Sequence, residues 1–118
     1  MRYLCLIYSE EKRLATAAKA DMDAMLTEYG AFTDEIKKSG KYLAGEGLQA
    51  TTTATTVRIR NGKLSTTDGP FAETKEQLGG FYLITAKDLN DAIQVAGRIP
   101  GAKIGSIEVR PVMEYNAA

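Results

Sequence analysis

Two segments of the chain are apolar on both of their alternating sides. The first is RYLCLIY at residues 2–8, and the second is GGFYLITA at residues 79–86. Because an extended chain points successive side chains to opposite faces, both faces of each segment would be apolar. Strands of this kind are typical of the middle of a sheet that is covered on both sides. The pattern predicts two central strands.

Two other segments carry the period of an amphipathic helix. In the first, apolar side chains recur at steps of three and four, at Ala18, Met22, Met25, Tyr29, Phe32 and Ile36. We expect this helix to end near Ser39, with Gly40 as its C-terminal cap. A shorter helix is expected between an N-cap at Asp88 and a stop at Pro100-Gly101. Its apolar stripe is predicted at Leu89, Ala92, Ile93 and Ala96.

Two more strands and a hairpin complete the pattern. KYLAGEGLQ at residues 41–49 predicts a strand interrupted by glycines, and SIEVRPV at residues 106–112 predicts the last strand. In VRIRNGKLS, the pair Asn61-Gly62 separates two alternating runs, which is a strong signal for a two-residue hairpin turn.

The register of this hairpin follows from its turn. We expect Ile59 to face Leu64 and Val57 to face Thr66, with the arginines on the other side. Since one side is apolar and the other is basic, the hairpin is expected to be half-buried, with its arginines in water.

The order of the elements predicts the fold class. Strand, helix, strand, hairpin, strand, helix and strand follow one another without a linker, so residues 1–118 are expected to form one domain. Such a chain is α+β, with a ferredoxin-like antiparallel sheet, both helices on one face and an extra β-hairpin. The other face would be apolar and exposed in a monomer. We therefore expect a homodimer through the open sheet face.

Composition narrows the classes of partner. Lys plus Arg and Asp plus Glu both total 15, so no positive surplus exists for nucleic acid or an anionic membrane. No segment has the length of a membrane span or the flanks of a signal peptide, and Cys5 has no second cysteine to pair with. A cytoplasmic location, with neither nucleic acid nor membrane as partner, is expected.

Composition also narrows the chemistry. The chain has no histidine, which removes the commonest general base and a common metal ligand. Cys5 lies in an apolar strand, where burial makes a thiol inert. No cofactor and no metal are expected, and any catalysis would depend on carboxylates, lysine, tyrosine, arginine or backbone amides.

The segment TTDGPFAETKEQLGG, residues 66–80, is the candidate site. In a ferredoxin-like sheet its end lies at the same edge as Tyr8 and Gly45-Glu46-Gly47, and glycines let a ligand approach the backbone closely. One hypothesis makes Asp68 or Glu73 a general base in a polar cleft. The expected ligand-binding residues are Tyr8, Phe71, Lys75 and Glu76, with Phe71 anchored in the core and Lys75 holding an anionic group. The alternative is a solvated cluster of ion pairs that contributes little.

Three stretches resemble a known family. DGPFAETKEQLGGFYLI, GAFTDEIKKSGKYLAGEGLQ and GSIEVRPVM are similar to the DGPF branch of the YCII-related proteins. The resemblance implies a dimeric α/β-barrel of the ferredoxin-like class and, through neighbouring genes in this branch, a link to sigma-factor regulation. The histidine and aspartate suggested as an active pair in other branches cannot be carried over, because this chain has no histidine.

Two functions remain open from the sequence. The first is a small-molecule enzyme of lyase, isomerase or hydrolase type, which acts on an anionic metabolite through a carboxylate base. The second is a non-catalytic module that binds a ligand or a protein such as a sigma factor. The sequence does not decide between them.

Overall fold

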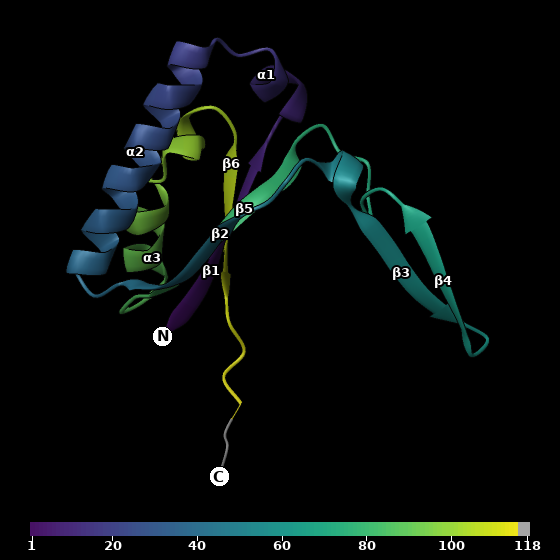
Figure 1. Ribbon diagram of the computed structural model, residues 1–118. Coiled ribbons are helices and arrows are strands. Elements are labelled where there is room, and N and C mark those ends of the chain that lie inside the picture. The colour runs from purple at the N-terminus through teal and green to yellow at the C-terminus, as the bar shows by residue number, and fades with distance from the viewer. Residues whose placement is uncertain (116–118) are drawn as a thin grey trace.

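The two segments that are apolar on both sides form the centre of an antiparallel sheet (Figure 1). The computed structural model describes residues 1–115. The strand order is β2-β5-β1-β6, with β1 (Arg2–Ser9) and β5 (Gln77–Thr85) inside and β2 (Tyr42–Gly47) and β6 (Ser106–Pro111) at the edges. This order and both central strands confirm the predicted ferredoxin-like sheet.

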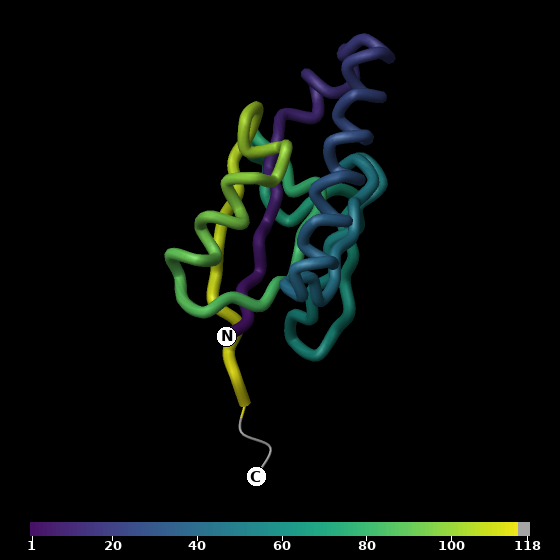
Figure 2. Tube along the Cα trace, turned by 90° about the vertical axis from the view of Figure 1, so that its left-hand side faces the viewer, coloured from purple at the N-terminus to yellow at the C-terminus, as the bar shows by residue number. Residues whose placement is uncertain are grey.

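Two helices cover one face of this sheet (Figures 1 and 2). They are α2 (Lys19–Lys38) and α3 (Leu89–Ala96), and a short helix α1 (Glu11–Ala15) follows β1. Helix α2 ends at the predicted glycine: Gly40 has φ 76°, its N–H donates to Lys37, and the N–H of Lys41 donates to Ile36. These two bonds form a Schellman motif, which satisfies carbonyls at the end of the helix.

The buried core lies between the helices and the sheet. Its large members come from alternate positions of β1 and β5, from one stripe of each helix and from the segment after α3, and they include Tyr3, Cys5, Phe32, Ile36, Tyr82, Ile84, Val95 and Ile99. The predicted stripe of α3 was partly wrong, because Leu89 and Ile93 are 49% and 48% exposed while Val95 is buried. This short helix presents Ala92, Val95 and Ala96 to the sheet, so Leu89 and Ile93 lie at its flank.

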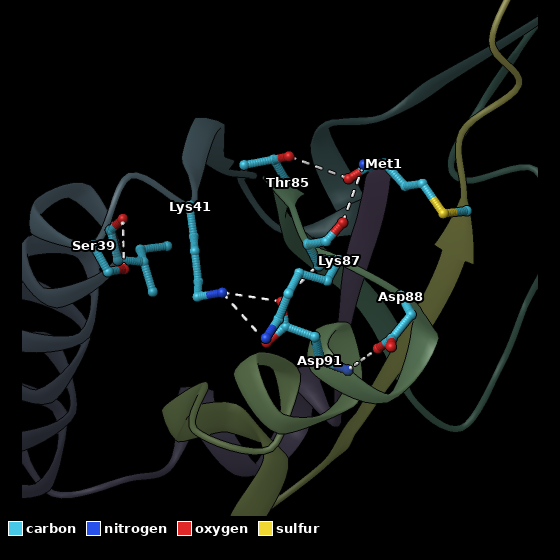
Figure 3. Close-up of polar contacts among 9 residues, drawn as sticks. Met1, Ser39, Lys41, Thr85, Lys87, Asp88 and Asp91 are labelled. Carbon is cyan, nitrogen blue, oxygen red and sulfur yellow. Dashed lines mark hydrogen bonds and ion pairs between the residues drawn. The ribbon is translucent and has the colours of Figure 1, made fainter.

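Helix α3 is held at its start by a polar cluster (Figure 3). The backbone N–H of Asp91 donates to Asp88 at 2.9 Å, which confirms the predicted N-cap. The carboxylate of Asp91 accepts the N–H of Lys87 at 3.0 Å and pairs with Lys41 at 3.0 Å. These hydrogen bonds hold the pKa of Asp91 below its usual range. The cluster joins the start of α3 to the chain that leaves α2.

A hairpin projects from the domain on the side of the sheet away from the helices (Figure 1). Its strands are β3 (Thr55–Arg60) and β4 (Lys63–Asp68), and they form a separate two-stranded sheet. The turn and register are as predicted: Asn61 and Gly62 have φ 53° and 74°, and Ile59 faces Leu64.

The predicted burial of the hairpin was wrong. Val57, Ile59 and Leu64 are 57%, 65% and 69% exposed, because the hairpin points away from the only core of the described chain. At the base of the hairpin, its two strands are joined further by the N–H of Gly69, which donates to Ala54 at 2.8 Å.

The face of the sheet opposite the helices carries apolar side chains at the other alternate positions of β1 and β5. These residues are Leu4, Leu6, Tyr8, Phe81 and Leu83, all partly exposed. No helix of the described residues lies over this face (Figure 1). Among residues 1–115 there is also no helix with the length and apolar character needed to cross a membrane.

Candidate functional site

A cavity of about 700 Å³ lies beneath the N-terminal half of α2. Its walls come from β1, α1, α2, the end of β2 and the start of β5, and its lining includes Ile7, Leu14, Met22, Met25, Tyr29, Thr33, Tyr42, Tyr82 and Ile104. Small-molecule sites in proteins are mostly apolar clefts of about 300–1,000 Å³ with a few placed polar groups. The cavity has the size and lining of such a site.

The cavity exists because α2 is longer than the core beneath it. Phe32 and Ile36, in its C-terminal half, are buried, whereas Met22 and Met25 in its N-terminal half are only partly covered. Helix α3 has 8 residues and α2 has 20. In the helical layer, α3 is therefore less than half as long as α2. The part of the sheet that lines the cavity is rich in glycine, including Gly45 and Gly79-Gly80, and these positions have no side chains to fill the space.

Tyr29 carries a placed polar group in this apolar wall. Its hydroxyl oxygen accepts a hydrogen bond from the backbone N–H of Gly101 at 3.1 Å. Gly101 permits this approach, because a Cβ there would lie 2.6 Å from the same oxygen. Among the described residues, the hydroxyl of Tyr29 donates to no acceptor. Its proton is therefore free to donate to a ligand.

A second hydroxyl group lies deeper in the cavity. The oxygens of Thr33 and Tyr82 are 2.7 Å apart and share one hydrogen bond, which leaves the hydrogen of the other hydroxyl free. The Tyr82 ring is fixed by an edge-to-face contact with Phe32, with ring centres 5.2 Å apart. Gly45 makes room for the ring, since a Cβ there would lie 2.8 Å from Tyr82 Cδ1.

The cavity holds neutral donors and no cation. Burial raises the pKa of both Tyr29 and Tyr82, so each phenol is protonated at neutral pH. Within residues 1–115, neither lysine nor arginine contributes to the lining. The arrangement suits hydrogen-bond acceptors on an uncharged ligand, because a buried anion without a cation nearby carries a large desolvation penalty.

A cluster of polar hydrogen bonds borders the cavity at Glu11 and Gln77. The carboxylate of Glu11 accepts the N–H and the hydroxyl of Thr51, both at 2.8 Å, and the backbone N–H of Glu11 donates to Gln77 at 2.9 Å. Thr51 begins the short helix η1 (Thr51–Thr53), so these hydrogen bonds join α1, η1 and β5. The Glu11 oxygens are occupied within the chain.

The residues predicted as catalytic lie outside this cavity. Asp68 ends β4 and Glu73 lies in the irregular segment that follows, and both are exposed. Phe71 is 81% exposed, with the Arg58 guanidinium 5.9 Å from its ring centre. The prediction that Phe71 anchors the loop in the core was wrong, because the segment follows the projecting hairpin. The catalytic role of Asp68 and Glu73 stays a prediction.

The other predicted binding residues lie at the expected sheet edge. Lys75 Nζ is 3.8 Å from a carboxylate oxygen of Glu10, and Glu76 accepts the hydroxyl of Ser106 at 2.8 Å. Ser106 pairs with Tyr8, whose side chain belongs to the open face of the sheet and not to the cavity. The structure thus brings Tyr8, Lys75 and Glu76 to one edge and leaves Asp68 and Glu73 without a hydrogen bond or ion pair to them.

Sequence reasoning missed the hydroxyl groups of the cavity. Tyr29 and Tyr82 occupy positions in apolar patterns, and the patterns predicted only that they are buried. The sequence did contain one signal for these groups, namely a tyrosine within an otherwise apolar stripe. A buried tyrosine hydroxyl needs a hydrogen-bond partner, so such a tyrosine indicates a polar contact inside the domain. The partner Gly101 comes from a distant part of the chain.

Fold and site together define a small ferredoxin-like α+β domain with an inserted hairpin and an apolar, ligand-sized cavity beneath its long helix. The chain belongs to the YCII-related domain family, whose model matches residues 1–116. It is also similar to an uncharacterised protein of Rhizobium meliloti (strain 1021), with 37% identity over 117 residues that cover 98% of this chain and 94% of the relative.

Proposed function

We propose that this domain binds one uncharged, largely apolar small molecule that carries a hydrogen-bond acceptor. The observation that carries the proposal is the hydroxyl of Tyr29, which is held by Gly101 at 3.1 Å with its own proton left to donate into the cavity. The second free hydrogen, from the pair of Thr33 and Tyr82, supplies a further contact. A few fixed donors in an apolar wall orient a ligand, while the wall supplies the affinity.

The charge of the expected ligand follows from the same lining. An anionic metabolite, as the sequence hypothesis required, would need a cation to compensate its lost hydration. The cation that was expected to serve, Lys75, lies 3.8 Å from Glu10, is exposed and does not line the cavity. An uncharged ligand avoids this penalty, and the proposal for the cavity therefore specifies one.

Binding in this cavity is proposed without a catalytic step. Both phenols have raised pKa values and act as hydrogen-bond donors at neutral pH, not as bases. The carboxylate of Glu11 is occupied by Thr51. These features favour a binding domain over a general-base enzyme for the cavity.

We also propose that the domain is a homodimer joined through the open sheet face. The support is the set of apolar side chains on that face, among them Leu4, Leu6, Phe81 and Leu83, which no described element covers. Exposed apolar patches of this kind mark interaction sites in soluble domains. A second copy offers a matching face, because a twofold interface uses the same patch on both chains.

Two fluorescent probes with one scaffold test the binding proposal. N-phenyl-1-naphthylamine is uncharged, and 8-anilino-1-naphthalenesulfonate adds one negative charge to the same ring system. We expect the uncharged probe to bind at one site per chain, at least tenfold more tightly than the sulfonate, because the cavity lining holds no cation. Equal affinities would contradict the proposal.

A matched pair of variants locates the bound probe. Met25→Trp places a large side chain in the cavity and is expected to abolish binding, whereas Met113→Trp makes the same change at an exposed position. Thermal melting shows whether each variant is folded. Unchanged binding to folded Met25→Trp would place the probe elsewhere and refute the cavity as the site.

The hypothesis of a carboxylate base is a separate proposal. The same binding assay tests whether its residues belong to the cavity site. It is supported by the hydrogen bond between Glu76 and Ser106, which ties the predicted segment to the sheet edge where Tyr8 lies. Asp68→Asn should leave binding of the uncharged probe unchanged, because Asp68 is exposed and does not line the cavity. A lowered affinity in Asp68→Asn would connect the two regions in one site and contradict their separation.

A further inference from the structure

The projecting hairpin has an apolar side that its own chain leaves exposed. Val57 and Ile59 of β3 and Leu64 of β4 share this side, since Ile59 is opposite Leu64 and the alternate positions point the other way. All three side chains are more than half exposed. Three large apolar residues on one side of a two-stranded ribbon are typical of a surface that packs on something else.

The hairpin extends on the side of the sheet that has no helices. Figure 1 shows α2 and α3 to the left of the sheet and β3 and β4 to its right, so the hairpin and the helices lie on opposite sides. In Figure 2, which is viewed from the side of the helices, the hairpin lies behind α2. The hairpin thus reaches into the space in front of the open sheet face, where a second copy would lie.

The dimensions of the chain point to a large missing contact. Its radius of gyration is 16.4 Å, against about 13.5 Å for a folded domain of this length. Its accessible surface is 8404 Å², against about 6,300 Å² for a monomeric protein of this mass. The excess is about 2,100 Å² per chain, or about 4,200 Å² for two chains, and obligate homodimer interfaces bury about 2,000–5,000 Å² over both chains. The exposed side chains of the hairpin, Val57, Ile59 and Leu64, are part of this surface.

The hairpin carries a positive charge on the side opposite its apolar residues. Residues 55–68 contain Arg58, Arg60 and Lys63 against a single carboxylate, Asp68, which gives a formal charge of about +2. Because the whole chain has a formal net charge of +0, the rest of the chain carries about −2. Arg58, Arg60 and Lys63 lie on the side of the ribbon opposite the apolar residues, so they stay in water when the apolar side packs on another copy. Two hairpins packed on each other would bring like charges together and repel.

We propose that the hairpin is an exchanged arm: in the homodimer, each copy packs Val57, Ile59 and Leu64 of its hairpin against the body of the other copy. This inference rests on the proposed homodimer and adds a second, reciprocal contact to the sheet-to-sheet contact. The arm explains why an inserted hairpin with a polar base, at Gly69 and Ala54, keeps an apolar side that its own chain does not bury.

Sedimentation velocity over a range of concentrations tests the arm. In the triple variant Val57→Thr, Ile59→Thr and Leu64→Thr, threonine keeps the β propensity of the strands and removes the apolar side. We expect the dissociation constant of the dimer to rise at least a hundredfold. The control variant Ser65→Thr with Thr67→Ser alters the opposite side of the same hairpin and should dimerise as the unmodified protein does.

The outcomes separate the arm from the dimer. A triple variant that dimerises with unchanged affinity would overturn the arm and leave the sheet-to-sheet dimer standing. An unmodified protein that is monomeric at 100 micromolar, roughly 1,000-fold above the affinity range of stable complexes, would overturn both. Thermal melting of the triple variant should be unchanged at concentrations where both proteins are monomeric, because the arm contributes nothing to the core of its own chain.

Chemical crosslinking provides a second measurement that does not depend on a variant. Lys63 is the first residue of β4, beside the turn of the hairpin. Figure 1 shows the turn between β3 and β4 far from the helices. In a mixture of ¹⁴N-labelled and ¹⁵N-labelled protein, an amine-reactive crosslinker should join Lys63 to lysines of the other isotope. Crosslinks from Lys63 that are all within one chain would contradict the exchanged arm.

Discussion

The hydroxyl oxygen of Tyr29 accepts a hydrogen bond from the backbone of Gly101 at 3.1 Å, although 72 positions separate the two residues in sequence. The bond joins the middle of α2 to the short helix η2 (Pro100–Lys103), which precedes β6. It fixes the height of α2 above the sheet at the point where the core ends and the cavity begins. Both the shape and the polarity of the cavity therefore depend on this pair.

Gly101→Ala should displace Tyr29. A Cβ at position 101 would lie 2.6 Å from the phenol oxygen and 3.2 Å from Ile7 Cγ2, so the helix or the ring must move. We expect the free energy of unfolding to fall by about 1–3 kcal/mol, as in other overpacked cores. Urea unfolding measures this change, and an unchanged midpoint would contradict the close contact.

Gly30→Ala is the matched control, and it should have the opposite effect. Gly30 lies one position along the same helix, but a Cβ there would meet no heavy atom within 4 Å. Alanine is favoured over glycine in a helix by about 1 kcal/mol, so the free energy of unfolding should rise by up to that amount. A destabilised Gly30→Ala variant would show that the backbone, not a side chain, requires glycine there.

Tyr29→Phe should weaken a ligand that carries an acceptor. Prodan is an uncharged naphthalene with a ketone, and its emission responds to hydrogen bonds. Since a neutral hydrogen bond contributes about 0.5–1.5 kcal/mol net, we expect its dissociation constant to rise roughly 2- to 13-fold, with a shift of emission to shorter wavelength. Tyr115→Phe removes an exposed hydroxyl and should change neither quantity. Equal behaviour of the two variants would contradict the donor role of Tyr29.

Cys5 should not react with thiol reagents while the protein is folded. Its side chain is buried in the core, and burial raises the pKa of the thiol to about 11. Modification by Ellman's reagent at pH 8 should therefore proceed only through unfolding and should accelerate with urea through the transition. Full reaction in guanidinium chloride confirms that the thiol is intact. Rapid modification in native buffer would show that β1 is open to solvent.

Asp91 should make stability depend on pH in the acid range. Its pKa is lowered by the N–H of Lys87 and by Lys41, so its contribution to stability is complete above the usual aspartate pKa, about 4, and disappears as the pH falls through the lower folded value. Asp91→Asn should be less stable than the unmodified protein at pH 7, and the difference should shrink as the pH falls below about 4. Urea unfolding at several pH values measures the difference.

Asp34→Asn is the control for this pH dependence. Asp34 is an exposed carboxylate on α2, and this variant should follow the unmodified protein at every pH. A difference between Asp91→Asn and the unmodified protein that stays constant with pH would mean that the charge of Asp91 is not what stabilises the start of α3.

Local features of the sequence determined most of the fold. The alternation in β1 and β5, the glycine after α2, the cap at Asp88 and the turn at Asn61-Gly62 are each encoded within a few residues. A strand period, a positive φ or a cap depends only on neighbours along the chain, so these features could be read without the tertiary structure. The order of the elements then left the ferredoxin-like arrangement as the simplest topology.

The tertiary structure alone determined where the cavity forms and which apolar side chains are exposed. Whether Tyr29 closes a core or points a proton into a cavity depends on Gly101, which the chain brings near only after the sheet has formed. Phe71 and Ile59 look like core residues in the sequence, yet the hairpin carries them away from the only core of the described chain. Hydrophobic patterning indicates which side chains favour burial. The positions of the other elements decide whether the same chain buries them.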